Sequence, residues 1–378
     1  MESMRMSGWR SDRWRWVAVL ALVVPLASCL SDDTTPNATR YRTAADRIMQ
    51  RYHIPGALIS VRVPGESEWQ AALGVGNVEQ GTPIDPRGHF SIRSITKSYT
   101  VTVLLQLVRE HALTLEDKLD KWIPGIPNGH LVSLADLAGM QSGIADYSAS
   151  EAFGAEFGAD PARAFTEQEL VDFAIAASPV FAPGVQYDYS NTNTVLLGMV
   201  IERVTGLPLD QVLRTRIFAP LALSGTTYPH VVPLPLPHAT PYDVNIVTGV
   251  TDQQPLISPT ALAGAGAMVS TLDDLSTWAL ALGDGRLIGP ELQHERIERS
   301  RVVTNGPEYE RYGLGIGILH GWWGHTGSGI GWQAAAFYDP RSGATIAVSI
   351  NATPNGGRRD LNLAQEIFSE LAGVVATR

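Results

Sequence analysis

Residues 94–108 read SITKSYTVTVLLQLV. The stretch begins with polar residues and continues with an apolar pattern, which predicts a largely buried helix over residues 94–109. Its first four residues form an S-x-x-K pattern. Because residues three apart share one face of a helix, the Lys97 amine would lie beside the Ser94 hydroxyl. The free N–H groups at a helix start could also stabilise a developing oxyanion. In the simpler alternative Ser94 caps the helix and Lys97 is exposed, although a first-turn lysine opposes the helix dipole.

Lysine is rare in this chain, which favours a specific role for Lys97. Only three of the 28 basic residues are lysines, at positions 97, 118 and 121, and the other basic residues are arginines. The net charge is −10, and no run of Lys or Arg follows the first residues. This pattern argues against nucleic acid as a partner.

A second polar cluster, Tyr189-Ser190-Asn191, lies between Pro183-Gly184 and a predicted helix over 192–204. A tyrosine can pass protons if a nearby cation lowers its pKa, and an asparagine can grip a substrate amide through both its donor and its acceptor. Alternatively, Ser190 or Asn191 caps the helix and Tyr189 packs against it.

A third cluster, GHTGSG over residues 324–329, precedes a predicted strand and a Gly-rich turn. His325 could tune a proton network. The glycines would let a strand edge approach a substrate closely, with the Ser328 N–H free to donate. The alternative is a Gly-rich hairpin that carries an ordinary surface histidine.

The remaining periodic segments predict a sheet that is built from both ends of the chain. Strands are expected at 57–63, 68–75, 311–319, 331–338 and 344–350, helices at 44–52, 133–140, 166–177, 192–204, 209–217, 271–282 and 361–371, and loops or short strands at 228–260. Late strands joined by short turns favour antiparallel pairing. We expect an α/β (α+β) fold, an antiparallel sheet flanked by helices, from residues 41–95 and 262–378, with a helical insertion over 96–261.

The N-terminus has the features of an export signal. Arginines at 5, 10, 13 and 15 precede an apolar run of about ten residues (17–26), which is too short to span a bilayer. Leu26-Ala27-Ser28-Cys29 follows and resembles a bacterial lipoprotein processing box, and Cys29 is the only cysteine. We expect a signal peptide at 1–28, lipidation at Cys29 and a tether at 29–40. A plain secretory signal is the alternative. Lipidation would place the protein in the cell envelope, on the outer face of the bacterial membrane.

Together, S-x-x-K, Y-S-N and H-T-G stand in the order found in penicillin-binding proteins and β-lactamases. The chain resembles the class C β-lactamase-related, penicillin-binding serine hydrolase superfamily, and within it a D-alanyl-D-alanine carboxypeptidase. The resemblance implies a β-lactamase/transpeptidase-like fold. It rests on SITKSYTVTVLLQLV (94–108), YSNTN (189–193), GMVIERVTG (198–206), AGAMVST (265–271), YGLGIG (312–317) and GHTGSG (324–329).

The resemblance also implies roles for single residues. Ser94 would attack the carbonyl and form an acyl-enzyme, while Lys97 takes or shares its proton. Tyr189 would act as acid and base toward the leaving group, with His325 supporting it. The substrate-binding residues would be Asn191, Thr326, Gly327 and Ser328. The Ser94 and Ser328 N–H groups would form the oxyanion hole, and Thr326 with the Ser328 hydroxyl would bind a terminal carboxylate.

One departure from this family concerns the substrate. The resembling carboxypeptidase carries an arginine after the Y-G-L-G-x run, where this chain has Gly317, and no Arg or Lys lies between Arg311 and Arg341. Without a bidentate partner a carboxylate is held less firmly. Peptidoglycan peptides, other small molecules and covalently bound β-lactams remain candidate ligands. The alternatives are an esterase or amidase for uncharged acyl groups, or a non-catalytic envelope lipoprotein.

Other catalytic motifs are missing from the sequence. It contains no G-x-S-x-G elbow, no P-loop and no G-x-G-x-x-G fingerprint, and its nine histidines show no ligand spacing such as H-E-x-x-H. We therefore expect neither a metal nor a cofactor.

Overall fold

A computed structural model describes residues 37–232, 234–307, 309–358 and 360–377. The predicted signal peptide and Cys29 lie outside these ranges. Helix α1 begins at Ala38, so the last three residues of the predicted tether belong to a helix instead. Within the described residues, none of the helices has the length and apolarity needed to cross a membrane.

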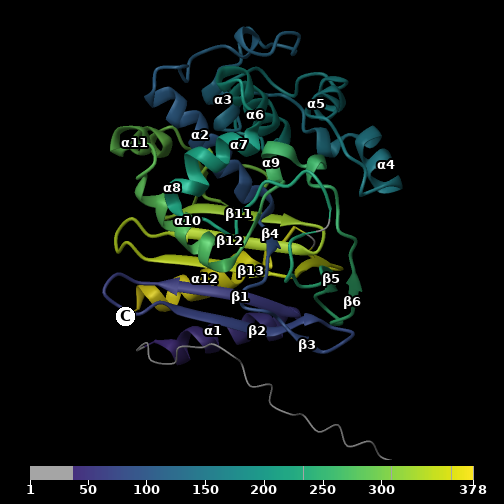
Figure 1. The fold of residues 1–378 in the computed structure, drawn as a ribbon, viewed down its shortest axis with the longest axis vertical. Coiled ribbons are helices and arrows are strands. Elements are labelled where there is room, and N and C mark those ends of the chain that lie inside the picture. The colour runs from purple at the N-terminus through teal and green to yellow at the C-terminus, as the bar shows by residue number, and fades with distance from the viewer. Residues whose placement is uncertain (1–36, 233, 308, 359, 378) are drawn as a thin grey trace, which may run out of the picture.

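The centre of the molecule is a nine-stranded sheet in the order β3-β2-β1-β13-β12-β11-β10-β9-β8, and every neighbouring pair is antiparallel. The three strands nearest the N-terminus therefore join the late strands through the β1–β13 pair (Figure 1). The strands are β1 (Gly56–Arg62), β2 (Trp69–Asn77), β3 (Thr82–Pro83), β8 (Arg301–Val302), β9 (Arg311–Tyr312), β10 (Gly317–Leu319), β11 (Trp322–Gly329), β12 (Trp332–Tyr338) and β13 (Thr345–Ile350).

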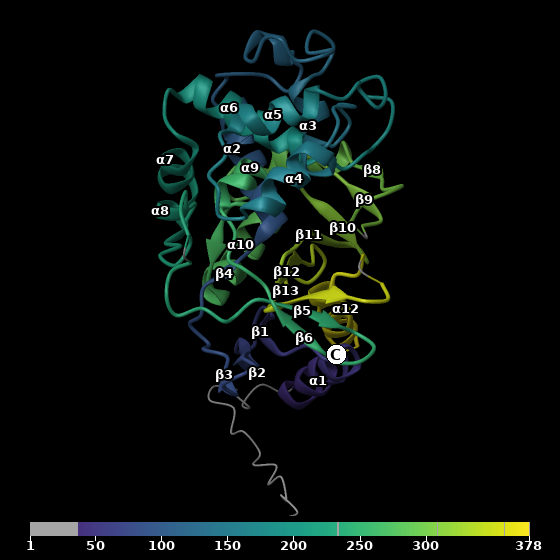
Figure 2. The same cartoon turned by 90° about the vertical axis from the view of Figure 1, so that its right-hand side faces the viewer.

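Alternating side chains of this sheet face two separate cores. On β12, Ala335 and Phe337 join the core under helices α1 (Ala38–Tyr52) and α12 (Leu363–Ala376), whereas Ala334 and Ala336 face α10 (Leu272–Asp284) and the remaining helices. Successive side chains on a strand point to opposite faces, so one strand can serve both cores. Figures 1 and 2 show α1 at the opposite end of the molecule from α3, α5 and α6.

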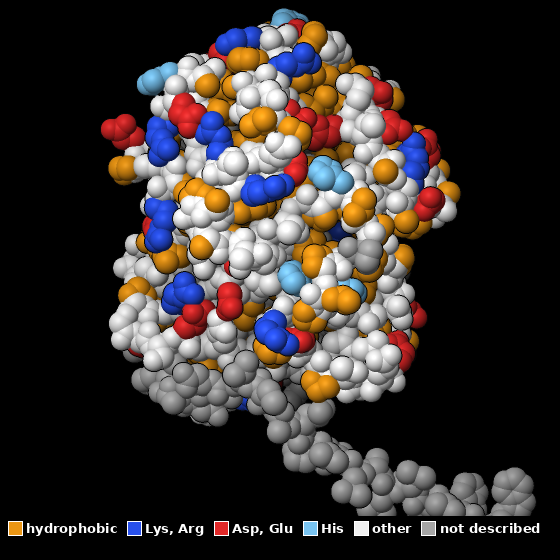
Figure 3. All heavy atoms as spheres, in the orientation of Figure 1, with side chains coloured by type: hydrophobic (Ala, Val, Ile, Leu, Met, Phe, Trp, Pro, Cys, Tyr) orange, Lys and Arg blue, Asp and Glu red, His pale blue; other side chains and the backbone are white. Residues whose placement is uncertain are grey.

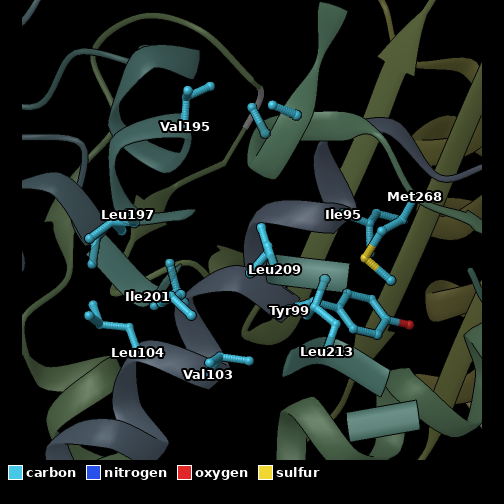
Figure 4. Close-up of a cluster of buried hydrophobic side chains, with 14 of the residues drawn as sticks. Ile95, Tyr99, Val103, Leu104, Val195, Leu197, Ile201, Leu209, Leu213 and Met268 are labelled. Carbon is cyan, nitrogen blue, oxygen red and sulfur yellow. The ribbon is translucent and has the colours of Figure 1, made fainter. Parts of the chain in front are cut away.

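Helix α10 packs on the second face of the sheet, and a helical layer adjoins it. It consists of α2 (Thr96–Arg109), α3 (Leu134–Ala138), α4 (Glu151–Ala159), α5 (Glu167–Ile175), α6 (Asn191–Thr205), α7 (Leu209–Leu213), α8 (Ala219–Leu221), α9 (Ala263–Gly266) and, beside it, α11 (Pro290–Glu298). Side chains of α2 and α6 meet in its core, as Figure 4 shows for Val103, Leu104 and Ile201. Because α2 is buried on nearly all sides, the residues at its start are held in one place.

Short elements complete the fold. Residues 228–260 contain β5 (Tyr242–Asn245) and β6 (Thr251–Gln253) of a small sheet that includes β14 (Ala352–Asn355). Strand β4 (Phe90–Ser91), which shortly precedes α2 in the sequence, pairs with β7 (Val269–Ser270). On the face shown in Figure 3, basic and acidic side chains lie interspersed among apolar ones.

Two strand predictions differ from the structure. The strand expected at 311–319 is interrupted, because the backbone between β9 and β10 turns at Gly315, which has a φ of +66° and donates its N–H to the Ala138 carbonyl. GHTGSG does not precede a strand but forms most of β11. Helices α4 and α11 were not predicted, because few of their side chains are buried and an apolar stripe is therefore missing.

Candidate active site

Ser94 lies in a tight turn, residues 93–95, that leads directly into helix α2. We call it the Ser94 turn. The serine is half-buried and opens into a cleft of about 620 Å³ between the helical layer and the end of β11. The residues that line the cleft are Arg93, Ser94, Tyr147, Ser148, Phe153, Gly154, Phe157, Tyr189, Asn191, Ile257, Leu262, Ala265, Gly266, Gly306, Pro307, Thr326, Ser328, Gly329, Ile330, Asp360, Asn362 and Gln365.

Lys97 is fully buried one turn further along α2. Its Nζ lies 3.0 Å from Ser94 Oγ, 2.7 Å from Asn191 Oδ1 and 2.8 Å from the Ala265 carbonyl oxygen. Burial lowers the pKa of Lys97 to about 7, and the Asp146 carboxylate offsets part of that shift. A neutral amine has two N–H groups and one lone pair. Since two carbonyl oxygens accept the N–H groups, the lone pair is left for the Ser94 hydroxyl proton.

Asn191 holds this lysine in place. Its Oδ1 accepts from Lys97, while its Nδ2 donates to Asp146 Oδ2 at 3.0 Å and to Ser148 Oγ at 3.1 Å. Both ends of the amide are therefore occupied by protein groups, although the residue also lines the cleft. The predicted grip on a substrate amide would require Asn191 to share these partners.

Tyr189 lies on the other side of the lysine, with Lys97 Nζ 5.0 Å from the centre of its ring. Its hydroxyl is buried and lies next to the Ser94 hydroxyl. Burial raises the pKa of Tyr189 well above 10, whereas the neighbouring Ser94 hydroxyl lowers it only in part. The expected lowering of this pKa by a cation is therefore outweighed, and Tyr189 keeps its proton and can act as a hydrogen-bond donor or acid.

Strand β11 forms the opposite edge of the cleft through Thr326 and Ser328. Its pairing with β10 ends at Gly324, so the edge beyond that residue faces the Ser94 turn. The Thr326 N–H donates across this open edge to the Tyr309 hydroxyl at 2.7 Å. Because N–H groups two residues apart point to the same edge of a strand, the Ser328 N–H also points to this edge.

Gly327 packs against the backbone of the Ser94 turn. A Cβ added there would lie 2.1 Å from the Ile92 carbonyl oxygen and 3.1 Å from Arg93 Cβ. The missing side chain lets β11 touch the Ser94 turn, and Gly327 is not among the residues that line the cleft. The close approach expected at this strand is thus made by the protein's own backbone.

His325 is fully buried and does not line the cleft. Burial, and next the Lys97 charge, lower the pKa of His325 to about 3, so the ring is neutral. Nδ1 lies 2.6 Å from the Thr326 carbonyl oxygen and must donate, which leaves Nε2 to accept from the Tyr312 hydroxyl at 3.0 Å. Tyr312 in turn packs edge-on against Tyr189, so His325 and Tyr189 are connected through a second ring.

Tyr309 occupies the space beside Gly317, where the family resemblance suggested an arginine. A Cβ at Gly317 would lie 2.5 Å from the Tyr309 ring. Since the Tyr309 oxygen accepts the Thr326 N–H, its own proton is available for Thr326 Oγ1 at 2.8 Å. The Thr326 hydroxyl proton can then point into the cleft. Nothing in the sequence around residue 309 indicated this role, because the residue lies in a loop without a motif.

One wall of the cleft is apolar. Phe153 and Phe157 of α4 stack at 5.4 Å between ring centres, and Tyr147 meets Phe153 edge-on at 5.1 Å. Ile257, Leu262 and Ile330 extend this surface. In the described part of the chain, no three His, Cys, Asp or Glu side chains gather where they could hold a metal ion.

Comparison with known proteins shows the family of the chain. The Beta-lactamase family model matches residues 42–368. D-aminopeptidase of Brucella anthropi is 28% identical over 299 residues, or 77% of this chain and 55% of that protein. Penicillin-binding protein 4* of Bacillus subtilis (strain 168) is 26% identical over 187 residues, or 49% of this chain and 40% of that protein. The chain spans about half the length of the curated relatives it matches.

Two solved structures share the fold. A D-stereospecific amidohydrolase from Streptomyces sp. is 31% identical with a TM-score of 0.75, covering 88% of this chain and 98% of that one. D-amino acid amidase from Ochrobactrum anthropi SV3, complexed with L-phenylalanine amide, is 24% identical with a TM-score of 0.80, covering 89% and 99%. The second likeness concerns the fold alone. A match over residues 42–368, on a fold shared with these structures, makes the chain a member of the Beta-lactamase family of serine hydrolases.

Proposed function

We propose that this serine hydrolase is a D-stereospecific amidohydrolase that cleaves amides of D-amino acids with apolar side chains. The observation that carries the proposal is the Tyr309 ring beside Gly317, which fills the place of a carboxylate-binding arginine. A leaving group without a carboxylate suits such a site better than a terminal D-alanine. The 31% identity to the Streptomyces amidohydrolase supports the same choice.

The hydrogen bonds of Lys97 in the resting site support the following reaction. Neutral Lys97 takes the Ser94 proton, and Ser94 Oγ attacks the amide carbonyl carbon. The oxyanion accepts from the Ser94 and Ser328 N–H groups. Tyr189 then donates its proton to the departing nitrogen as the C–N bond breaks, and Lys97 returns a proton to Tyr189. Water attacks the resulting ester by the reverse path, which releases the D-amino acid and restores Ser94.

The apolar wall supports the choice of side chain. The apolar wall includes Phe153, Phe157 and Leu262. Burial of an apolar substrate group against these side chains stabilises binding by about 25 cal/mol for each Å² of apolar surface removed from water, and it requires no particular direction of contact. Two charged side chains line the cleft, Arg93 and Asp360, and Asp360 pairs with Arg358 at 2.9 Å. A phenyl or branched aliphatic group therefore fits this wall better than a charged group.

A matched set of substrates tests this proposal. Release of ammonia should be measured from the amides of D-phenylalanine, L-phenylalanine and D-aspartate, with wild type and Ser94→Ala. We expect D-phenylalanine amide to be cleaved at least about tenfold faster than both others, because the wall and the fixed oxyanion hole select shape and charge. Equal rates for D- and L-phenylalanine amide would contradict the stereospecificity. Activity that persists in Ser94→Ala would contradict the nucleophile.

β-Lactams and the N-terminal signal supply two further proposals. The Ser94–Lys97 pair supports covalent capture of a fluorescent penicillin, which intact-mass spectrometry would detect as an adduct lost in Ser94→Ala.

The processing box supports lipidation of Cys29 and placement on the outer face of the cell membrane. Radiolabelled palmitate should be incorporated by the full-length protein and not by Cys29→Ser, and equal labelling of both would contradict the anchor.

A further inference from the structure

Arg93, the residue immediately before Ser94, carries a guanidinium group that the proposed reaction does not use. The side chain is 6% exposed and lines the cleft. Its Nε donates to the Gly329 carbonyl at 2.9 Å, and its Nη2 donates to the Ile330 carbonyl at 3.1 Å. Among the described residues it has no acidic partner, and burial is the one influence that lowers its pKa, to about 10. The group therefore stays charged at neutral pH.

The backbone of Arg93 is also unusual. Its φ is +48°, in the left-handed region that residues with a Cβ rarely adopt. Glycine would adopt this conformation without the steric cost. A bulky charged residue held in a strained conformation beside a reacting group points to a role in function.

The two hydrogen bonds of Arg93 connect the two halves of the oxyanion hole. One N–H of the hole belongs to Ser94, which follows Arg93 in the chain. The other belongs to Ser328, which precedes Gly329. The guanidinium thus ties together two segments that are 236 residues apart in sequence, at the point where their N–H groups must converge.

The charge of Arg93 has a second consequence. In the resting site the guanidinium is paired with neutral carbonyls alone. When Ser94 attacks, a negative charge forms on the substrate oxygen between the two segments that Arg93 joins. A buried cation without an acidic partner interacts more strongly with that oxyanion than with the neutral ground state, which is the condition for lowering a barrier.

We propose that Arg93 is a positioning residue that holds the Ser94 turn and the end of β11 at the spacing of a working oxyanion hole and adds a fixed positive charge beside it. The inference rests on Ser94 as the nucleophile of the proposed function, but not on the identity of the substrate.

The test compares Arg93→Gly, Arg93→Met and Arg93→Lys. Arg93→Gly suits the left-handed backbone, so it should fold at least as well as wild type while losing the clamp. We expect Arg93→Gly and Arg93→Met to lower kcat about 10- to 100-fold with KM changed less than about threefold, as for loss of an oxyanion contact. Arg93→Lys should recover part of the loss, because it restores the charge and one hydrogen bond.

A second readout separates this role from a purely structural one. A boronic acid forms an anionic tetrahedral adduct with a serine and mimics the charged intermediate. Its affinity should fall in each variant by nearly the same factor as kcat/KM, while the affinity for benzyl alcohol, an uncharged ligand that forms no oxyanion, stays constant. A kcat for Arg93→Gly equal to that of wild type, or boronate affinities that do not follow kcat/KM, would overturn the proposal.

Arg296 is a matched control. It is 1% exposed and likewise donates from Nε to a carbonyl, that of Leu314 at 3.1 Å, and from Nη2 to Thr102 Oγ1 at 2.7 Å, but it does not line the cleft. Arg296→Met should lower stability without changing kcat per folded molecule. An equal loss of kcat in Arg296→Met would make the Arg93 effect generic and refute the proposal.

The measurements also separate this inference from the proposed function. If wild type cleaves no D-amino acid amide, the amidohydrolase proposal fails, while acylation of Ser94 by p-nitrophenyl acetate still reports on Arg93. That rate should fall by the same factor in Arg93→Gly. If wild type cleaves the amides and Arg93→Gly cleaves them equally fast, only the inference about Arg93 fails.

Discussion

The side of the cleft around Lys97 and the side formed by helix α4 differ in how tightly their atoms are held. Lys97 is fully buried, and its amine contacts three named oxygen atoms, each within 3.0 Å. On α4, Phe153 is the one buried residue, and a Cβ added at Gly154 or Gly158 would meet no atom within 4 Å. On the Lys97 side, hydrogen bonds fix the position of the amine, whereas the α4 side is an open apolar surface.

This difference follows from the forces on each side. A polar group that is buried without a partner costs about 1–3 kcal/mol, so the polar side can work only when nearly every hydrogen bond is made. Apolar contact has no direction, so the α4 side can change shape at a small cost. We infer that the Lys97 side carries the chemistry and that the α4 side selects the substrate.

The largest effect should come from Ser94→Ala, which removes the attacking oxygen and leaves the Lys97 side otherwise intact. We expect turnover to fall by about 10⁴-fold or more, as for loss of the nucleophile in other serine hydrolases. Steady-state kinetics on D-phenylalanine amide would measure this. Ser91→Ala is the matched control, because Ser91 is buried in β4 three residues earlier and does not line the cleft. A similar loss in Ser91→Ala would point to misfolding instead.

The protonation of Lys97 should govern the pH profile. The amine must be neutral to accept the Ser94 proton, so kcat/KM should rise with pH and level off above about 7. Lys97→Met should lower kcat/KM by about 10²- to 10⁴-fold and abolish this inflection. A wild-type profile that stays flat between pH 5 and 9 would mean that Lys97 is not the base.

Gly327→Ala tests the close approach of β11 to the Ser94 turn. The new Cβ would overlap the Ile92 carbonyl oxygen, so the strand and the turn must separate. We expect about 1–3 kcal/mol of lost stability from overpacking and about a 100-fold loss of kcat from the misplaced oxyanion hole. Thermal denaturation and steady-state kinetics would measure the two. Gly158→Ala, in open space on α4, should leave both unchanged or slightly raise stability.

The smallest effect should come from the α4 wall. Gly154 lines the cleft and Gly158 does not, although both lie in open space on one helix and neither has a positive φ. Gly154→Phe should fill the cleft and lower the rate ratio of D-phenylalanine amide to D-alanine amide by about tenfold. Gly158→Phe should leave that ratio unchanged. If both variants, or neither, change the ratio, α4 does not select the side chain.

The chemistry of this protein is more visible in its sequence than its selectivity. The Ser94–Lys97 pair follows from the geometry of one helix turn, and the order of Y-S-N and H-T-G indicated which other segments join it. Helix α4, which forms much of the apolar wall, was missed because it buries one side chain and shows no periodic stripe. Arg93 directly precedes Ser94 in the sequence, but no sequence pattern indicates that its side chain donates hydrogen bonds to the carbonyls of Gly329 and Ile330.

The sequence by itself determined the spacing of Ser94 and Lys97, the apolar pattern of α2 and the positions of most strands near both ends of the chain, because each depends on neighbours a few residues away. Only the tertiary structure decided that Lys97 is half neutral near pH 7, that Gly327 serves the approach of β11, and that Tyr309 fills the place of a missing arginine. These features depend on burial and on contacts between distant segments. No local pattern encodes such contacts, because they exist only once the chain has folded.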